Sequence, residues 1–292
     1  MKLAWLSCLA LLLSSPGGAA TGGAVWLDEG LGARWLGMGG AARAAVRDVH
    51  AGYWNPAALS AIGAETFQVG SMLTLQSMGR STASLSGSWQ TDRAGTFAVN
   101  WLHHAVTGLE RVDDQGTVTG GAGSAADALL VSAGWAPFYQ LRAGVTAKLM
   151  RESIFDFSAT GGAADAGFLV QPVLSEDFWI GLTVINAAGS MAWKGGGTDT
   201  PARSIGGGAA WRGWADRLLV AADAASRDGA VGFHAGAEFW AVPMAAVRAG
   251  WNDGRPSAGA AYLWKPYQLD YAFTFDPDTI GTRHQVSFLL HF

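Results

Sequence analysis

The feature that most constrains this chain is an alternation of apolar and small polar side chains from about residue 65 onward. It is clearest at residues 267–275, where Tyr, Leu, Tyr, Phe and Phe share one face while Gln, Asp, Ala and Thr share the other. A period of two residues is that of a β-strand, whereas a helix has a period of 3.6. The sequence therefore predicts an all-β fold.

Segments with this alternation repeat along the chain and are separated by turn residues. The pattern predicts about fourteen strands, near residues 64–76, 79–90, 94–104, 126–136, 140–151, 162–171, 177–188, 202–212, 216–226, 230–241, 243–251, 254–264, 267–275 and 285–292. An even number of strands is typical of a closed antiparallel barrel that has both ends of the chain on the same side.

The composition indicates what the outer face of such a barrel meets. Charged residues make up 14% of the chain and apolar residues 50%, whereas soluble domains carry roughly 25% charged residues. A soluble β-sandwich or propeller would need a charged or polar outer face. Here one face of each expected strand is apolar, and the other is mostly Gly, Ala, Ser, Thr and Gln, which suits a lumen lined with small polar groups. We therefore predict a transmembrane antiparallel β-barrel. The net charge of −4, without a basic run, argues against nucleic-acid binding.

The first 20 residues have the pattern of a signal peptide. Lys2 precedes an apolar stretch at 3–13, and small residues follow up to Ala20. Cys8 is the only cysteine and lies inside the apolar stretch, so we expect no lipidation and, after cleavage, neither disulfides nor thiol chemistry. No long apolar run follows, which excludes a transmembrane helix. Export together with a barrel predicts the bacterial outer membrane.

Connection lengths and aromatic residues predict the orientation in the membrane. The three longest expected connections, 105–125, 152–161 and 189–201, all fall on one side, which is the outer side if the C-terminus is periplasmic. Aromatic residues near the expected strand ends are candidates for the interfacial girdles of such a barrel. These are Trp89, Trp135, Trp179, Trp211, Trp240, Trp251 and Tyr267.

Residues 25–61 do not alternate. They combine Gly clusters, Ala-rich short-helix material, charges and a Pro turn, and such backbone cannot face lipid. We therefore divide the chain into a signal peptide (1–20), an N-terminal hatch inside or below the barrel (21–62), and the barrel itself (63–292). Pro56 fixes its own φ and moves Asn55 out of the helical region, which predicts a turn from the hatch toward the first strand.

Two motifs in this hatch carry a family resemblance. Gly-Ala-Arg-x-x-Gly-Met-Gly-Gly-Ala at 32–41, followed by Tyr-Trp-Asn-Pro-Ala-x-Leu at 53–59, resembles the opening of the PorV/PorQ family. That family is similar to FadL-type fatty-acid transporters, whose N-terminal plug also holds an Asn-Pro-Ala turn. The resemblance continues in 233–240, 248–251 and 281–288. It implies a hatch motif made of Arg34, Gly37, Met38, Gly39, Gly40, Tyr53, Trp54, Asn55, Pro56 and Ala57.

The chain also departs from the family. Relatives usually carry an Asp-Asp pair before Tyr-Trp, whereas this chain has Arg47-Asp48 and then His50. It is short for the family and has compact expected outer loops, which leave less room for a protein-docking surface.

Strand parity places eight ionisable residues inside the barrel: Arg142, Lys148, Asp165, Asp223, His234, Glu238, Arg248 and Asp270. One interpretation is a polar pathway that the hatch gates. The other, which we favour because buried charges need partners, is that they pair with one another and with charged hatch residues, and so hold the hatch in place. The hatch candidates are Arg34, Arg43, Arg47 and Asp48.

Nothing in the sequence predicts an enzyme, a cofactor or a metal site. Residues 37–42 match a dinucleotide-binding pattern, but no buried parallel strand precedes them. The adjacent His103 and His104 point to opposite faces of a strand, and His234 and Glu238 would lie roughly 13 Å apart along theirs. A Gly-x-Ser-x-Gly nucleophile elbow is missing from the sequence.

The sequence thus predicts an outer-membrane barrel that passes small hydrophobic molecules, as the FadL resemblance implies. The alternatives are a PorV-like accessory of type IX protein secretion and a purely structural barrel. The expected partners are outer-membrane lipid, the β-barrel assembly machinery, with Phe292 as the C-terminal assembly signal, and either a small hydrophobic ligand or secretion-system proteins.

Overall fold

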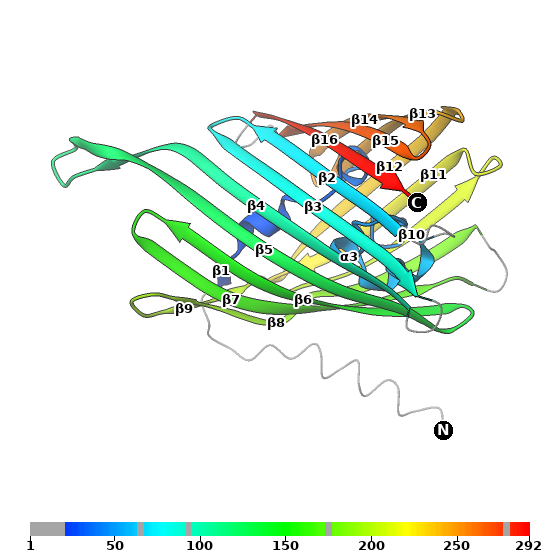
Figure 1. Cartoon of the computed structure of the whole chain (residues 1–292), viewed down its shortest axis with the longest axis horizontal. Coiled ribbons are helices and arrows are strands. Elements are labelled where there is room, and N and C mark those ends of the chain that lie inside the picture. The colour runs from blue at the N-terminus through cyan, green and yellow to red at the C-terminus, as the bar shows by residue number, and fades with distance from the viewer. Residues whose placement is uncertain (1–20, 63–66, 92–94, 173–176, 277–280) are drawn as a thin grey trace, which may run out of the picture.

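The strands of this computed structural model form one closed barrel (Figure 1). The structure describes residues 21–62, 67–91, 95–172, 177–276 and 281–292; the expected signal peptide lies outside these residues. The wall consists of β2 (Phe67–Gln76), β3 (Arg80–Thr91), β4 (Gly95–Val112), β5 (Val118–Phe138), β6 (Leu141–Ile154), β7 (Phe157–Val170), β8 (Phe178–Trp193), β10 (Ser204–Gly213), β11 (Leu218–Arg227), β12 (Ala230–Val242), β13 (Ala245–Asn252), β14 (Arg255–Trp264), β15 (Tyr267–Asp276) and β16 (Gly281–His291).

Backbone pairing closes the wall. The last strand, β16, pairs antiparallel with β2, and β8 pairs with both β7 and β10. Each of the fourteen wall strands therefore has two neighbours, so their backbone N–H and C=O groups bond to one another, as a hydrocarbon environment requires. This confirms the predicted closed antiparallel barrel. Two short strands, β1 (Thr21–Gly23) and β9 (Thr198–Pro201), pair in parallel beside it.

The two faces of the wall differ as the alternation predicts. The outward face exposes large apolar side chains, among them Leu73, Leu85, Leu129, Val131, Val145, Leu149, Phe168, Leu182, Val220, Val247, Leu269 and Val286. The inward face buries small polar ones, among them Gln68, Ser84, Ser86, Thr96, Asn100, Ser132, Thr146, Thr183, Gln268, Gln285 and Ser287. An exposed apolar band around a closed barrel is the surface that lipid covers.

Two of the seven predicted girdle residues do not face outward. Trp89, Trp135, Trp211 and Trp251 are exposed on the outer face. Trp240 instead donates its indole N–H to the buried Glu238, and the ring of Trp179 is covered by arginine side chains from inside the barrel. Both residues are at strand ends, but their parity is that of the inward positions, so the prediction was wrong for them.

The three predicted long loops are mostly strand. β4 and β5 extend through 105–125 to a turn between residues 112 and 118, and β6 to β8 extend similarly through 152–161 and 189–193. These green strands extend beyond the rest of the wall, to the left in Figure 1. The residues added at 118–121 are exposed on both faces, so they lack the apolar-polar alternation that marks a lipid-facing strand. The sequence pattern stops where both faces meet water, although the strands continue.

This difference between the two parts of the strands predicts where the membrane ends along the barrel wall. Val131→Arg, at an outward position in the apolar band, is expected to cost about 2–4 kcal/mol of barrel stability. The same change at Val118, which lies on the extension and is similarly exposed (54% against 49%), is expected to cost about 0–1 kcal/mol. Denaturant unfolding of both variants in lipid vesicles measures the difference. Equal costs at the two positions would contradict this membrane level.

The hatch, residues 21–62, lies inside the barrel and is made of four short helices: η1 (Val25–Glu29), α2 (Ala33–Gly37), α3 (Ala51–Trp54) and η2 (Pro56–Ala61). Among the described residues, none of the helices is long and apolar enough to cross a membrane. The fully buried hatch residues Trp35, Met38 and Leu59 belong to a core that also includes the wall residues Leu169 and Leu219. The hatch therefore fills this part of the lumen with a packed core.

Candidate functional site: the hatch and the lumen

The wall has small residues where the hatch backbone approaches it. A Cβ added to Gly144 would lie 2.3 Å from the carbonyl carbon of Pro56, and one added to Gly250 would lie 2.1 Å from the backbone nitrogen of Gly39. Gly39 itself has a φ of +68° and lies against the backbone of Trp251, so it needs glycine for both conformation and space. The close approach of the hatch to the wall thus depends on glycines in both the hatch and the wall.

The Asn55-Pro56 turn joins three parts of the structure. Asn55 is extended, as the following proline requires, and its side chain accepts a hydrogen bond from the N–H of Ala57 to begin η2. Its amide group donates to the carbonyls of Arg43 at 2.7 Å and of Phe168 on β7 at 3.1 Å. This turn therefore fastens two segments of the hatch to the wall.

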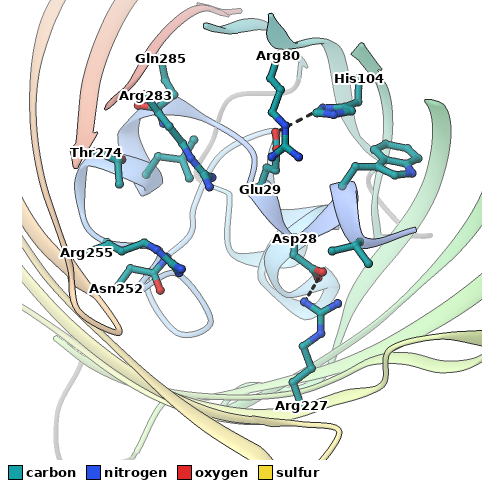
Figure 2. Close-up of a pocket in the computed structure, with 14 residues that line it drawn as sticks. Asp28, Glu29, Arg80, His104, Arg227, Asn252, Arg255, Thr274, Arg283 and Gln285 are labelled. Carbon is teal, nitrogen blue, oxygen red and sulfur yellow. Dashed lines mark ion pairs between the residues drawn. The ribbon is translucent and has the colours of Figure 1, made fainter. Parts of the chain in front are cut away.

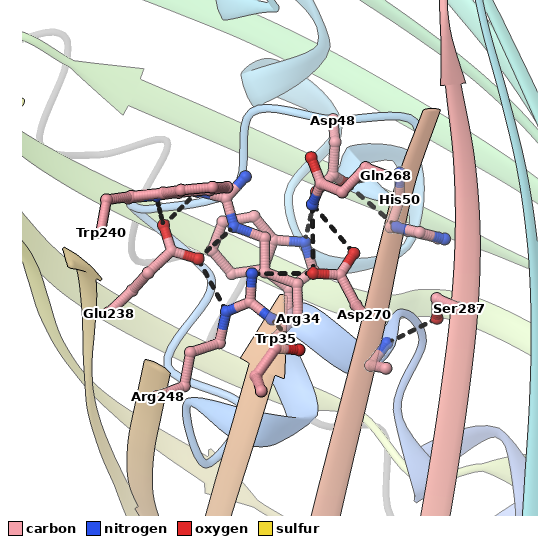
Figure 3. A network of polar contacts seen from close by, with 12 residues as sticks. Arg34, Trp35, Asp48, His50, Glu238, Trp240, Arg248, Gln268, Asp270 and Ser287 are labelled. Atoms are coloured by element: carbon pink, nitrogen blue, oxygen red, sulfur yellow. Dashed lines mark hydrogen bonds and ion pairs between the residues drawn. The ribbon is translucent and has the colours of Figure 1, made fainter. Parts of the chain in front are cut away.

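An ion-pair network joins the hatch to β12, β13 and β15 (Figure 3). Arg34 donates to both carboxylate oxygens of Glu238, at 2.9 and 2.6 Å. Arg248 donates to Glu238 at 2.7 Å and lies 2.8 Å from Asp270. All of these side chains are almost completely buried except Arg34, which is 13% exposed. Burial alone would lower the pKa of Arg34, but the charge of Glu238 outweighs it and raises that pKa.

A second layer of contacts lies behind this network. Trp35 donates its indole N–H to Asp48 at 2.8 Å, and the Asp48 carboxylate also contacts His50 (Figure 3). Burial would raise the pKa of Asp48, but the contacts with His50 and the charge of Arg34 outweigh burial and lower it to about 2. Asp48 therefore stays ionised and orders the loop between α2 and α3.

Asp223 on β11 makes a separate attachment. One of its oxygens accepts hydrogen bonds from the backbone N–H groups of Ala42 and Arg43, each at 2.9 Å, and lies 3.5 Å from the Arg43 guanidinium. On the neighbouring strand, the ring of His234 lies 3.0 Å from the carbonyl oxygen of Gly39. Because a carbonyl oxygen only accepts, His234 donates in this contact.

Lys148 and Asp165 pair with each other and not with the hatch. Their charged atoms lie 2.9 Å apart, and both groups bond to Asn186, which adopts a positive φ of 52°. The register of β7 and β8 shifts at this point, so residues 185–187 of β8 lie opposite Asp165 alone. The pair stabilises a β-bulge in the wall. No pattern in the sequence indicates this role of Asn186.

Arg142 lies at the end of the barrel where η2 packs. Its guanidinium is 4.6 Å from the ring centre of Trp179, and that of Arg47 from the hatch is 4.5 Å from the same ring. Burial and the nearby charges of Arg212, Arg142 and Arg34 lower the pKa of Arg47 to about 9. All eight residues chosen by parity therefore point into the barrel, but only the charges of Glu238 and Asp223 pair with a hatch charge.

The remaining motif residues also form contacts within the closed barrel. The Tyr53 hydroxyl donates to the carbonyl of Leu27, and Trp54 donates to that of Leu31 at 2.8 Å. Gly37, Gly40, Met38 and Ala57 lie in the buried part of the hatch. At the opposite end of the sequence, the backbone of Phe292 pairs with that of Phe67, which joins the two ends of the barrel sequence. Among the described residues, no cluster of His, Cys, Asp and Glu is suited to hold a metal ion.

A cavity of about 340 Å³ remains beside η1 (Figure 2). Its lining includes Asp28 and Glu29 from the hatch and four arginines from the wall, Arg80, Arg227, Arg255 and Arg283. The wall arginines are close to the ends of β3, β11, β14 and β16, on the inward face. They were not among the residues predicted from the sequence, although strand parity applied to the ends of the strands would have found them.

Another part of the lumen is apolar. Met72, Leu102, Leu130, Met150 and Met191 from the wall are buried, and Trp26 and Leu27 from η1 belong to the same hydrophobic cluster. The lumen beside η1 therefore has an apolar side as well as the charged lining of the cavity.

The fold and the hatch together define the class of structure: a closed 14-strand barrel of the FadL-like outer-membrane type, with its N-terminal segment inside. The toluene transporter TbuX of Ralstonia pickettii superposes with a TM-score of 0.66 at 15% identity, over 92% of this chain and 100% of that chain. The toluene transporter TodX of Pseudomonas putida gives 0.61 at 14% identity, over 90% and 97%.

A FadL homologue of Pseudomonas aeruginosa superposes with a TM-score of 0.54 at 10% identity, over 94% of this chain and 97% of that chain. No family model and no curated protein matches this sequence. At these identities the likeness shows a shared fold, and the PorV/PorQ resemblance is not shown by these comparisons.

Proposed function

We propose that this protein passes small hydrophobic molecules across a bacterial outer membrane. The observation that carries the proposal is the apolar side of the lumen, where Met72, Leu102, Leu130, Met150 and Met191 lie inside a barrel whose other inward positions are mostly polar. Apolar side chains inside a barrel offer a hydrophobic molecule an environment that water does not. The shared fold with two toluene transporters supports the same conclusion.

The hatch sets how such a molecule would pass. It packs against β5, β6 and β7 through η2 and against β14 and β15 through α2, so an axial route requires part of the hatch to move. The hatch core rests on tight glycine contacts and buried ion pairs, whereas the η1 segment borders the cavity. Trp26 and Leu27 of η1 are therefore the hatch residues that a ligand on the apolar side would displace first.

The type IX secretion accessory has less support. TbuX, TodX and CymD, which share this fold, are named as transporters or channels of hydrocarbons and not as secretion components. The outer turns, such as residues 113–117, are short. We therefore keep hydrocarbon passage as the proposal, together with outer-membrane residence after export and assembly through the Phe292 end, and we propose no enzymatic activity.

Uptake into proteoliposomes tests this function. Vesicles that contain the protein are expected to take up toluene into a trapped hydrophobic acceptor faster than empty vesicles do. Met150→Gln should reduce this difference several-fold, because a buried amide without a partner costs about 1–3 kcal/mol and makes the wall less apolar. Met78→Gln, at a methionine that is 74% exposed in the β2–β3 turn, is the matched control and should leave uptake unchanged. Uptake equal to that of empty vesicles would overturn the proposal.

A further inference from the structure

Three arginine side chains meet at the end of the lumen that also holds the C-terminus, opposite the extended strands (Figure 1). Arg47 comes from the hatch, Arg142 from the start of β6 and Arg212 from the end of β10. The guanidiniums of Arg47 and Arg142 lie 4.5 and 4.6 Å from the ring centre of Trp179. Arg212 lies on the neighbouring strand, where Ala210, two residues before it and on the same face, pairs with Trp179. We call these three residues the arginine cluster.

The charges of the arginine cluster act on one another. Among the neighbouring charges that lower the pKa of Arg47, that of Arg212 has the largest effect and that of Arg142 the next. Since the repulsion between like charges falls with distance, the three guanidiniums are close together. With a pKa of about 9, Arg47 keeps its charge at neutral pH. Each of the three side chains is only partly buried, so a ligand from the aqueous phase can reach the cluster.

The other arginines between the hatch and the wall have carboxylate partners. Arg34 and Arg248 share Glu238, and Arg43 lies beside Asp223. In the part of the chain that the structure describes, no member of the arginine cluster forms an ion pair with a carboxylate. Because buried charges need partners, this is the part of the contact between hatch and wall that lacks its opposite charge.

The hydrogen bonds of the arginine cluster are also incomplete. Arg47 donates to the carbonyl oxygen of Val46 at 2.6 Å, and Arg142 donates through Nε to that of Ser60 at 3.5 Å. Another nitrogen of Arg142, Nη1, is buried and has no hydrogen-bond partner among the described residues. Buried donors in proteins are nearly always paired, so this one favours a bound acceptor.

We propose that the arginine cluster binds a phosphate group, which thereby bridges the hatch and the wall. A guanidinium binds phosphate through paired hydrogen bonds, and the oxygens of one phosphate can accept from several guanidiniums at once. The bound anion replaces the repulsion between Arg47 and the two wall arginines by attraction, so it holds this part of the hatch in place. The site goes beyond the proposed passage, because it concerns what keeps the hatch closed and not what moves through the barrel.

Isothermal titration calorimetry of the full-length protein in a non-ionic detergent tests the site, with inorganic phosphate and acetate as probes at neutral pH and constant ionic strength. One phosphate should bind per chain, at least about tenfold more tightly than acetate, which has fewer oxygens and less charge. Arg212→Gln and Arg142→Gln should each weaken phosphate binding about tenfold. Arg212→Lys should restore part of the loss because it keeps the charge.

The denaturant midpoint separates phosphate binding from a structural role of Arg212. Phosphate should raise the midpoint of the wild-type protein and leave that of the Arg212→Gln variant unchanged. In chloride, this variant should unfold no earlier than the wild type, because the substitution removes a charge that repels Arg47. A variant midpoint below that of the wild type in both solutions would show that Arg212 serves packing alone, and would overturn the inference.

The matched control is Arg151→Gln, which removes the same charge from an exposed position on the wall and should leave phosphate binding unchanged. Circular dichroism and heat-modifiable migration on gels establish that each variant is folded. The site would be refuted by a wild-type protein that binds no phosphate, by acetate binding as tight as that of phosphate, or by wild-type affinity in both glutamine variants of the cluster.

The phosphate group can come from solution or from a lipid headgroup at this end of the barrel, and a second titration in phospholipid nanodiscs distinguishes these sources. Undiminished binding of inorganic phosphate in nanodiscs supports the site with a soluble phosphate as its ligand. Binding in detergent that is lost in nanodiscs supports the same site with a lipid headgroup already bound.

Discussion

Replacing Glu238 by glutamine is expected to lower the stability of the barrel by about 3–5 kcal/mol, the cost of removing one partner from a buried ion pair. Glu238 is 1% exposed and is the carboxylate shared by Arg34 of the hatch and Arg248 of the wall. Glutamine keeps the shape but not the charge, so Arg34 loses its only ion-pair partner among the described residues. The measurements are the denaturant midpoint in lipid vesicles and the ionic conductance of single molecules in planar bilayers.

The conductance should rise in this variant, because the ion pair of Glu238 with Arg34, like that of Asp223 with Arg43, attaches the hatch to the wall. Asp127→Asn is the control. It neutralises a carboxylate that pairs with His103 but is 41% exposed, and exposed pairs contribute about 0–1 kcal/mol. A Glu238→Gln variant that unfolds with the wild-type midpoint and conducts no better would show that the network does not hold the hatch.

The Gly144→Ala variant is expected to prevent the hatch from seating fully. The new methyl group would lie 2.3 Å from the carbonyl carbon of Pro56, and backbone cannot move aside as a flexible side chain does. Overpacking of this kind costs about 1–3 kcal/mol, which corresponds to a gain of roughly five- to 150-fold in the displaced population. An added cysteine at Ala45, buried in the hatch, reports this displacement through its rate of reaction with a water-soluble maleimide.

Gly87→Ala is the matched control, because no atom lies within 4 Å of the Cβ that it would add. Maleimide should react with the Ala45→Cys protein slowly in the wild-type and Gly87→Ala backgrounds and about tenfold faster in the Gly144→Ala background. Equal rates in all three would mean that the hatch does not depend on the close approach of Pro56 to β6.

The alternation predicted the wall well because each residue there has one of two environments. At β15 and β16, apolar side chains face outward and polar ones inward. Because the side chains alternate with a period of two, the face of one residue determines the face of every other residue in the strand. Strand parity also predicted correctly that all eight selected ionisable side chains point into the barrel. The same reasoning failed at residues 118–121, where both faces meet water, and at Trp179, whose type suits an interface although its parity points inward.

The partners of the inward charges depend on register, and register depends on the whole barrel. Asp223 bonds to Ala42 and Arg43 because β11 lies where the hatch turns past it, and no local pattern near either residue indicates that contact. Asn186 is similar, since its role arises from a β-bulge that shifts β8 against β7. The arginines of the cavity come from four strands that are distant in sequence, so only closure of the barrel brings them together.

Whether the outward face touches lipid can be measured by attaching a nitroxide to single cysteines at Leu85, Val131 and Val247 and comparing collision with oxygen and with a water-soluble nickel complex. These positions lie on β3, β5 and β13, and their side chains are 49–57% exposed. In bilayers, all three are expected to collide with oxygen and to be shielded from nickel, whereas a label at Val118 meets nickel freely. Nickel access at all three equal to that at Val118 would contradict a membrane-spanning barrel.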